Sequence, residues 1–173
     1  MYKMLRRKCK ECQGMKNSNK CTNCFLGYSF NKGKCIVNHS IKAEYITHRE
    51  DELIFLIHPN FISHIKEMIL DDKKIIPNHK YLINKPGIHT IYYSLDNEFE
   101  YLGEMFYGVE NLTSIIFTQL FNTENVTNTN FMFWGCKKLK SIGLSYFKTD
   151  NIDNMSRMFQ GCSELKSLNL SSF

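Results

Sequence analysis

A twenty-residue phrase that occurs twice near the end of the chain constrains the fold more than any other feature. Residues 125–144 read NVTNTNFMFWGCKKLKSIGL and residues 151–170 read NIDNMSRMFQGCSELKSLNL. A third, more divergent copy begins at Met105, and the distances from Met105 to Met132 and from Met132 to Met158 are 27 and 26 residues. A period of this length is typical of stacked repeats, in which each copy forms one supersecondary unit and packs on the next.

The spacing of the apolar residues changes halfway through the phrase. Met155, Met158 and Phe159 stand three and four residues apart in the first half, as on one face of a short helical turn. Gly161 then supplies a residue that can adopt the left-handed conformation at the end of such a turn. In the second half, residues 139–144 follow the pattern L-x-x-I-x-L, which predicts a strand. We therefore expect each copy to fold as a short helical turn followed by a strand.

The apolar residues that match between the copies are the predicted core of the repeats. One copy cannot bury both of its apolar faces, so neighbouring copies must cover each other. Burial of a large apolar side chain contributes roughly 1.5–3 kcal/mol. A row of methionines at helical spacing is far more often core than cofactor site. The predicted repeat core comprises Met105, Phe106, Leu112, Ile115, Met132, Phe133, Cys136, Leu139, Ile142, Leu144, Met158, Phe159, Cys162, Leu165, Leu168 and Leu170.

The phrases MFWGCKKLKSIGLSYFKTDNIDNMSRMF and MFQGCSELKSLNLSSF resemble the repeat of the BspA-like leucine-rich-repeat surface proteins. The resemblance covers residues 105–173, and the first copies depart from the pattern at Val109, where the family has Cys, and at Thr129, where it has Met. It implies a leucine-rich-repeat solenoid of about two and a half repeats. It further implies display at a cell surface, adhesion or host interaction, and no catalysis.

Five of the seven cysteines lie in the stretch CKECQGMKNSNKCTNCFLGYSFNKGKC. Cys9, Cys12, Cys21 and Cys24 form two C-x-x-C pairs, whose four thiolates could hold a tetrahedral zinc ion. The eight-residue gap between the pairs is short for a zinc ribbon. The other interpretation is a set of disulfides among these four and Cys35, because a short segment with few large apolar residues needs such cross-links to fold.

The same stretch is similar to the cysteine-rich repeats of growth-factor-receptor and furin-like extracellular modules. The similarity lies in C-x-x-C-x-x-G-Y followed by G-x-C. In those modules the glycine makes a tight turn and the last cysteine closes a disulfide across a small hairpin. The resemblance implies a Cys24–Cys35 disulfide, a second disulfide between two of Cys9, Cys12 and Cys21, and one cysteine left over. It favours disulfides over zinc.

The segment 39–101 reads as short strands separated by turn signals. Predicted strands cover residues 43–47, 53–57, 65–70, 74–76, 81–85 and 88–95. The third and fourth form a hairpin around Asp71-Asp72, although a helix over residues 61–70 fits the same apolar spacing. Several short strands of this kind suggest a small β-sandwich. The phrase Pro-Gly-x-His-x-Ile-x-Tyr, residues 86–93, also resembles a strand of immunoglobulin-like modules.

The predicted fold class is mainly β with short helices, in three parts. Residues 1–38 form a basic cysteine-rich knob, residues 39–101 a small β-sandwich-like domain, and residues 102–173 a truncated leucine-rich-repeat solenoid. Hydrophobic residues make up 43% of the 173, enough to bury a core. No run of eighteen apolar residues occurs, so we expect no membrane span.

Positive charge is concentrated at the start of the chain. Residues 1–42 contain ten Lys or Arg and one acid, Glu11, a balance of +9, which leaves −4 for the other residues out of a total of +5. A basic arm can bind nucleic acid, anionic glycans or lipid head groups. Because no aromatic residues are interleaved at regular spacing, we do not expect nucleic-acid binding.

No catalytic constellation is visible in the sequence. The six histidines are scattered, and the chain has no glycine-rich phosphate loop, no G-x-S-x-G and no H-E-x-x-H. Asp71-Asp72 is typical of a turn rather than a metal site. We therefore expect neither an enzyme nor a cofactor.

Two functions fit these observations. The first is an extracellular adhesion or recognition module for a protein or glycan ligand at a cell surface, and five N-glycosylation sequons are compatible with it. The second is an intracellular interaction scaffold with a four-cysteine zinc knuckle. The start MYKMLRRKCK is no signal peptide, and the end LNLSSF stops within a repeat. We therefore expect a fragment of a longer protein, located at the cell surface.

Overall fold

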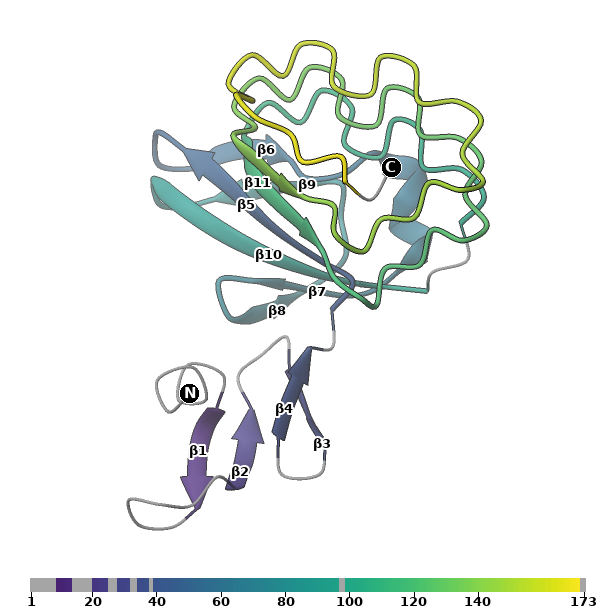
Figure 1. Ribbon diagram of the computed structural model, residues 1–173. Coiled ribbons are helices and arrows are strands. Elements are labelled where there is room, and N and C mark those ends of the chain that lie inside the picture. The colour runs from purple at the N-terminus through teal and green to yellow at the C-terminus, as the bar shows by residue number, and fades with distance from the viewer. Residues whose placement is uncertain are drawn as a thin grey trace. The chain divides into compact units, whose positions relative to one another are not determined.

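The computed structural model describes residues 9–13, 20–24, 28–31, 34–37, 39–96 and 99–171, with side chains from residue 39 onward. The chain divides into two compact units, Met1–His39 and Ser40–Phe173. The first unit contains two antiparallel hairpins (Figure 1). They are β1 (Cys9–Gln13) with β2 (Lys20–Cys24), and β3 (Tyr28–Asn31) with β4 (Lys34–Val37).

A six-stranded mixed sheet in the order β12-β11-β5-β10-β7-β8 organises the second unit (Figure 1). Only the β11–β12 pair is parallel. A separate antiparallel pair joins β6 and β9, and η1 is a short 3-10 helix. Within the described ranges, no helix is long and apolar enough to cross a membrane. The elements are β5 (Ile41–Thr47), β6 (Glu52–Phe55), η1 (Pro59–His64), β7 (Ile65–Leu70), β8 (Lys73–Ile75), β9 (Lys80–Ile83), β10 (Gly87–Leu95), β11 (Leu112–Phe117) and β12 (Ser141–Gly143).

Strict alternation of side chains along β5 and β10 creates the buried face of the sheet. Ile41, Ala43 and Tyr45 on β5, and Ile91 and Tyr93 on β10, are fully buried, whereas the residues that alternate with them are partly exposed. This is the period of two that a strand with one covered face requires. The ring of Tyr93 meets Phe106 of the C-terminal segment edge to face at 6.5 Å. One continuous core therefore joins the middle of the chain to its C-terminal segment.

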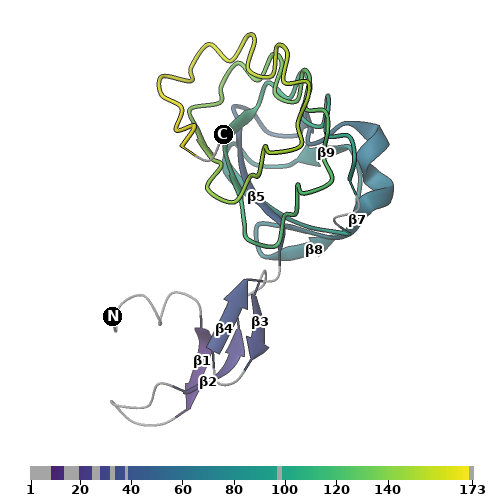
Figure 2. The same cartoon turned by 45° about the vertical axis from the view of Figure 1, so that its right-hand side comes forward.

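The C-terminal segment consists of three windings stacked on one another (Figures 1 and 2). We call them rungs 1, 2 and 3, spanning residues 101–127, 128–153 and 154–171. Backbone hydrogen bonds connect neighbouring rungs: the Phe106 N–H donates to Met132 O at 2.9 Å, and the Phe133 N–H donates to Met158 O at 2.9 Å. The bonded residues are 26 and 25 positions apart, one fewer than the sequence period in each case, so the period matches the length of one winding.

The predicted helical turn is wrong, because the N–H groups of rungs 1 and 2 alternate between two kinds of acceptor. Those of Phe106 and Gly108 donate to carbonyls of rung 2. Those of Met105, Tyr107 and Val109 donate to the carbonyl three residues earlier, at 3.3, 2.9 and 3.2 Å. An α-helix needs every N–H for the carbonyl four residues back. The windings are therefore successive tight turns that also pair sideways.

Positive φ angles recur at equivalent places in the three rungs. Glu104, Phe131 and Arg157 have φ of 63°, 55° and 56°, although L-residues seldom adopt this region. Gly161 has φ of 82°, and a Cβ built on it would lie 3.3 Å from the Cα and N of Gly135. Glycine is required there both for its backbone conformation and for the close approach of two rungs.

The predicted β-sandwich followed by a leucine-rich-repeat solenoid is also wrong. β11, which belongs to rung 1, pairs antiparallel with β5, and Ile115 lies opposite Ala43. The strand of the first repeat copy is therefore an inner strand of the same sheet that holds β5, β7, β8 and β10. In the described part of the chain, no second sheet of the immunoglobulin-like kind faces that sheet. Its buried face meets Phe106 of rung 1 at Tyr93, and Leu56, which directly follows β6, at Tyr45. Residues 165–170, the third predicted repeat strand, form no strand.

The strands and the hairpin predicted within residues 39–101 agree better with the structure. β7 and β8 pair around Asp71-Asp72, so the hairpin is confirmed and the helix over residues 61–70 is wrong beyond His64. The predicted strands at 43–47, 53–57, 81–85 and 88–95 correspond to β5, β6, β9 and β10, with small shifts at their ends.

The predicted repeat-core residues differ in burial according to rung. Rung 3 has more partly exposed core residues than rungs 1 and 2, because no further rung packs on its outer side among the described residues. The fully buried members are Met105, Phe106, Leu112, Ile115, Met132, Phe133, Cys136, Leu139, Leu144 and Met158. Ile142, Phe159, Cys162, Leu165 and Leu168 are partly buried. Leu170 is 45% exposed, contrary to its prediction as core.

Candidate functional site

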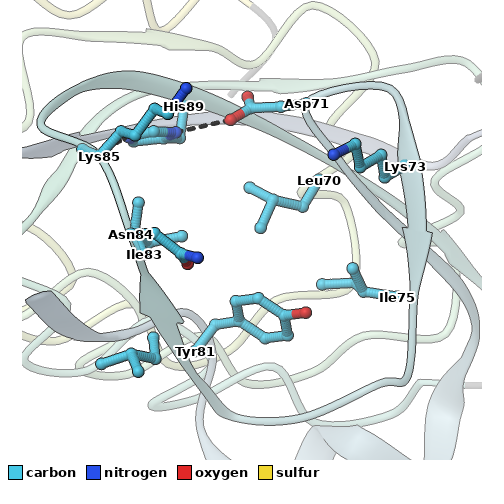
Figure 3. Close-up of a pocket in the computed structure, with 10 residues that line it drawn as sticks. Leu70, Asp71, Lys73, Ile75, Tyr81, Ile83, Asn84, Lys85 and His89 are labelled. Carbon is cyan, nitrogen blue, oxygen red and sulfur yellow. Dashed lines mark hydrogen bonds and ion pairs between the residues drawn. The ribbon is translucent and has the colours of Figure 1, made fainter. Parts of the chain in front are cut away.

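An open cavity of about 390 Å³ lies beside the β7–β8 hairpin and the connection from β9 to β10 (Figure 3). Its volume is within the range of about 300–1,000 Å³ that is common for small-molecule sites. The apolar lining consists of Leu70, Ile75, Leu82 and Ile83. The polar lining consists of Asp71, Lys73, Tyr81, Asn84, Lys85 and His89.

Two turns place the polar residues around this cavity. Asp71 and Asp72, the two residues between β7 and β8, have φ of 45° and 63°. A two-residue hairpin loop with φ positive at both positions matches the right-handed twist of its strands, and aspartate tolerates that conformation. On the other side, Gly87 has φ of 141° at the start of β10, directly after the chain has passed the cavity. This turn positions Asn84 and Lys85.

Asp71 and His89 form a hydrogen-bonded clamp at the edge of the cavity. The His89 Nδ1 lies 2.6 Å from Asp71 Oδ2, and the Thr90 N–H donates to Asp71 Oδ1 at 2.8 Å. The His89 Nε2 is 3.0 Å from the Lys85 carbonyl oxygen and 3.1 Å from Thr47 Oγ1. Each ring nitrogen therefore has an acceptor to which it donates when it carries a proton. The clamp ties the β7–β8 turn to β10.

We expect Asp71→Asn to lower the free energy of unfolding by about 1–2 kcal/mol, because a charge-assisted hydrogen bond to a 10%-exposed histidine side chain is weakened. Asp72→Asn is the matched control. Asparagine suits the positive φ at both positions, and no side-chain hydrogen bond of Asp72 occurs within the described residues. Urea denaturation of the two variants measures the difference. Equal losses at both positions would contradict the clamp.

The remaining polar groups of the cavity have no protein partner in the described part of the chain. These are the Lys73 and Lys85 ammonium groups, the Tyr81 hydroxyl and the Asn84 amide. Figure 3 shows Lys73 reaching toward Leu70 in the middle of the cavity, Asn84 entering from the opposite side, and the Tyr81 ring crossing the lower edge. Unsatisfied donors and acceptors around an apolar floor are what a bound ligand would engage.

A second hollow, of about 490 Å³, lies over rungs 1 and 2 but offers fewer free groups. Its lining includes Lys148, whose ammonium donates to Glu124 Oε1. Thr123 Oγ1 donates to the Lys148 carbonyl at 2.8 Å and accepts from the Lys148 N–H at 2.8 Å. Because these charged and polar groups satisfy one another, we favour the cavity beside the β7–β8 hairpin as the functional site.

The backbone of the first unit brings four of the predicted site cysteines onto one hairpin. In the β1–β2 register Cys9 lies opposite Cys24, and Cys12 lies opposite Cys21. Cys35 lies opposite Phe30 on the other hairpin. The side chains of all five lie outside the described residues, so the disulfides and the zinc site stay predictions. Among the described residues, no group of three or more His, Cys, Asp or Glu could hold a metal ion.

Cys136 and Cys162 are free thiols inside the stack of rungs. Each thiol donates to the carbonyl of the preceding rung at 3.1 Å, Cys136 to Phe106 and Cys162 to Phe133. Burial raises the pKa of both thiols, that of Cys162 to about 11. Both are therefore protonated core residues rather than nucleophiles.

Sequence reasoning did not single out the cavity residues. Asp71 was assigned to a turn, His89 was one of six scattered histidines, and Lys73, Asn84 and Lys85 carried no motif. The clamp joins residues 18 positions apart, on strands whose pairing had to be known first. The turn signals at Asp71-Asp72 and at Pro86-Gly87 were the only local indication that these residues meet.

Comparison with protein families gives the rungs a different match from the one that the repeat phrase suggested. Residues 100–173 match the family described as Mycoplasma protein of unknown function, DUF285. The C-terminal part of the chain is therefore similar to DUF285. No leucine-rich-repeat family and no furin-like family matches, so both resemblances proposed from the sequence are wrong.

The DUF285-like segment coincides with the three rungs. Its L-x-x-L-x-L spacing places Leu112, Ile115 and Phe117 of rung 1 in the core. No curated protein and no solved structure matches the chain.

Proposed function

We propose that this protein is a non-catalytic recognition module that acts in adhesion at a cell surface, with the cavity beside the β7–β8 hairpin as its ligand site. The observation that carries the proposal is the set of unpartnered polar groups on Lys73, Tyr81, Asn84 and Lys85 around an apolar floor. A small number of polar groups over an apolar surface is the usual composition of a binding site.

The geometry of the cavity favours binding over catalysis. The Asp71–His89 pair would be the natural acid–base system, but both ring nitrogens of His89 already have hydrogen-bond partners within the protein. A general base needs a free nitrogen within reach of the substrate proton. Thr47, the hydroxyl nearest to His89, is buried and donates to the Lys85 carbonyl, so it is not available as a nucleophile.

An extracellular location is supported by the composition of the chain. The cysteine-rich first unit suits an oxidising compartment, and the sequons suit secretion. A protein or glycan on a partner cell is the ligand that such a location would offer.

Cell-binding measurements with the labelled full chain test the proposal. We expect saturable binding, and we expect the double variant Lys73→Ala, Asn84→Ala to bind at least about tenfold more weakly, a change of about 1.4 kcal/mol. Lys66→Ala with Asn60→Ala is the matched control, since both residues are exposed and lie outside the cavity. Absence of saturable binding, or equal weakening by both double variants, would refute the proposal.

A further inference from the structure

We propose that the ligand of this cavity is an acidic sugar at the end of a glycan chain, an inference that rests on the proposed function and specifies its ligand. The cavity combines unpaired positive charge, an aromatic ring and an amide group. A sugar that carries a carboxylate presents the complementary groups, namely a negative charge, a C–H-bearing ring face and several hydroxyls.

The charged groups of the cavity leave a positive surplus. Asp71 is its only carboxylate, and both of its oxygens already accept hydrogen bonds, from His89 and from the Thr90 N–H. The ammonium groups of Lys73 and Lys85 have no ion-pair partner among the described residues. A carboxylate bound beside Lys73 would therefore meet a free cation and no competing free anion, and charge-assisted hydrogen bonds of this kind are stronger than neutral ones.

The uncharged groups favour a sugar over an acyl chain. The Tyr81 ring is half-buried and borders the apolar floor of Leu70 and Ile75, as Figure 3 shows. The C–H face of a pyranose ring is apolar and can pack on such a ring while its hydroxyls face outward. The Asn84 amide offers both a donor and an acceptor, which suits hydroxyl groups. An acyl chain would leave the amide and the Tyr81 hydroxyl without partners.

The open form of the cavity favours the end of a chain. A cavity of about 390 Å³ that opens to solvent admits a terminal residue while the rest of the glycan stays outside. Specificity would then come from the carboxylate, because the neutral analogue would leave the Lys73 ammonium without its counter-charge.

Titration of the full chain with methyl glycosides of N-acetylneuraminic acid, glucuronic acid and glucose, followed by NMR, tests this inference. We expect at least one acidic glycoside to bind about tenfold more tightly than the neutral one, and its affinity to fall as salt rises. Lys73→Gln should weaken acidic binding about tenfold and leave neutral binding unchanged, because it removes the charge but keeps a hydrogen-bonding side chain. Lys66→Gln is the control and should change neither.

The outcomes separate this inference from the proposed function. If the chain binds cells through the cavity but neither acidic glycoside binds or competes, the ligand is of another class and the inference is wrong. Equal affinity for acidic and neutral glycosides would also overturn it. Loss of cell binding altogether would instead refute the proposed function, whatever the glycosides do.

Discussion

Replacement of Phe133 by alanine is expected to lower the free energy of unfolding by about 3–5 kcal/mol, the usual cost of removing a buried aromatic side chain. Phe133 is fully buried in rung 2. Its ring stacks on Phe106 and on Phe159 at 5.5 Å with an interplanar angle of 1° in both cases, and it meets Phe117 edge to face at 6.2 Å. The cavity left behind would face three rings at once. Urea denaturation followed by circular dichroism measures the loss.

Phe159→Ala is the matched control for this substitution. Phe159 occupies the same place in rung 3, but it is only partly buried, and among the described residues its one ring contact is the stack on Phe133. Its loss should cost less than half as much as the loss of Phe133. If Phe159→Ala destabilises the chain as much as Phe133→Ala does, stacking between the rungs is not what stabilises the C-terminal segment.

Sequence was most informative where local chemistry decides the structure. The strands β5 and β10 and the Asp71-Asp72 turn each follow from residues close together in the chain, and all three were predicted. The helical turn was predicted wrongly because a tight turn also joins residues three apart, as the bond from the Met158 N–H to the Met155 carbonyl does, so Met155, Met158 and Phe159 fit either structure. Hydrogen bonds to the neighbouring rung decide between a helical turn and tight turns, and the spacing of residues in the sequence does not reveal these bonds.

Pairing between distant strands could not be predicted in the same way. The alternation in β5 fits a sandwich and a mixed sheet equally well. Two hydrogen bonds accompany the pairing of β5 with β11: Ser114 Oγ donates to Glu44 Oε2 at 2.9 Å, and Thr113 Oγ1 donates to the Glu44 carbonyl at 3.0 Å. These residues are about seventy positions apart, and nothing in their types distinguishes them from other polar residues at strand edges.

The cavity was unpredictable for a related reason. Lysine, asparagine and tyrosine are common surface residues, and only their convergence from β8, β9 and the following turn distinguishes them. That convergence depends on how the β6–β9 pair lies beside the β7–β8 hairpin. A single sequence carries no signal for it beyond the two turns.

Above pH 10 the free energy of unfolding should fall steeply, by about 1.4 kcal/mol per pH unit for each of Tyr45 and Tyr93. Both side chains are fully buried, and burial raises the pKa of both phenols above the ordinary value of 10.0. Their hydroxyls lie 2.6 Å apart, and that of Tyr45 donates to the Leu56 carbonyl at 2.8 Å. Above pH 10 the unfolded chain releases protons that the folded chain retains, so rising pH favours unfolding.

Urea denaturation between about pH 8 and pH 11 measures this dependence, and phenylalanine variants isolate the contribution of the tyrosines. Cys136 and Cys162 also have raised pKa values and add to the loss in the wild type. The difference in slope between the wild type and Tyr45→Phe therefore reports the tyrosine alone. That variant should lose about half of the tyrosine-dependent slope, because the Tyr93 hydroxyl remains, 3.3 Å from the Leu56 carbonyl.

Tyr146→Phe, at a 54%-exposed position, should leave the slope unchanged. An unchanged slope in a Tyr45→Phe, Tyr93→Phe double variant would show that the buried phenols ionise as freely in the folded chain as in water.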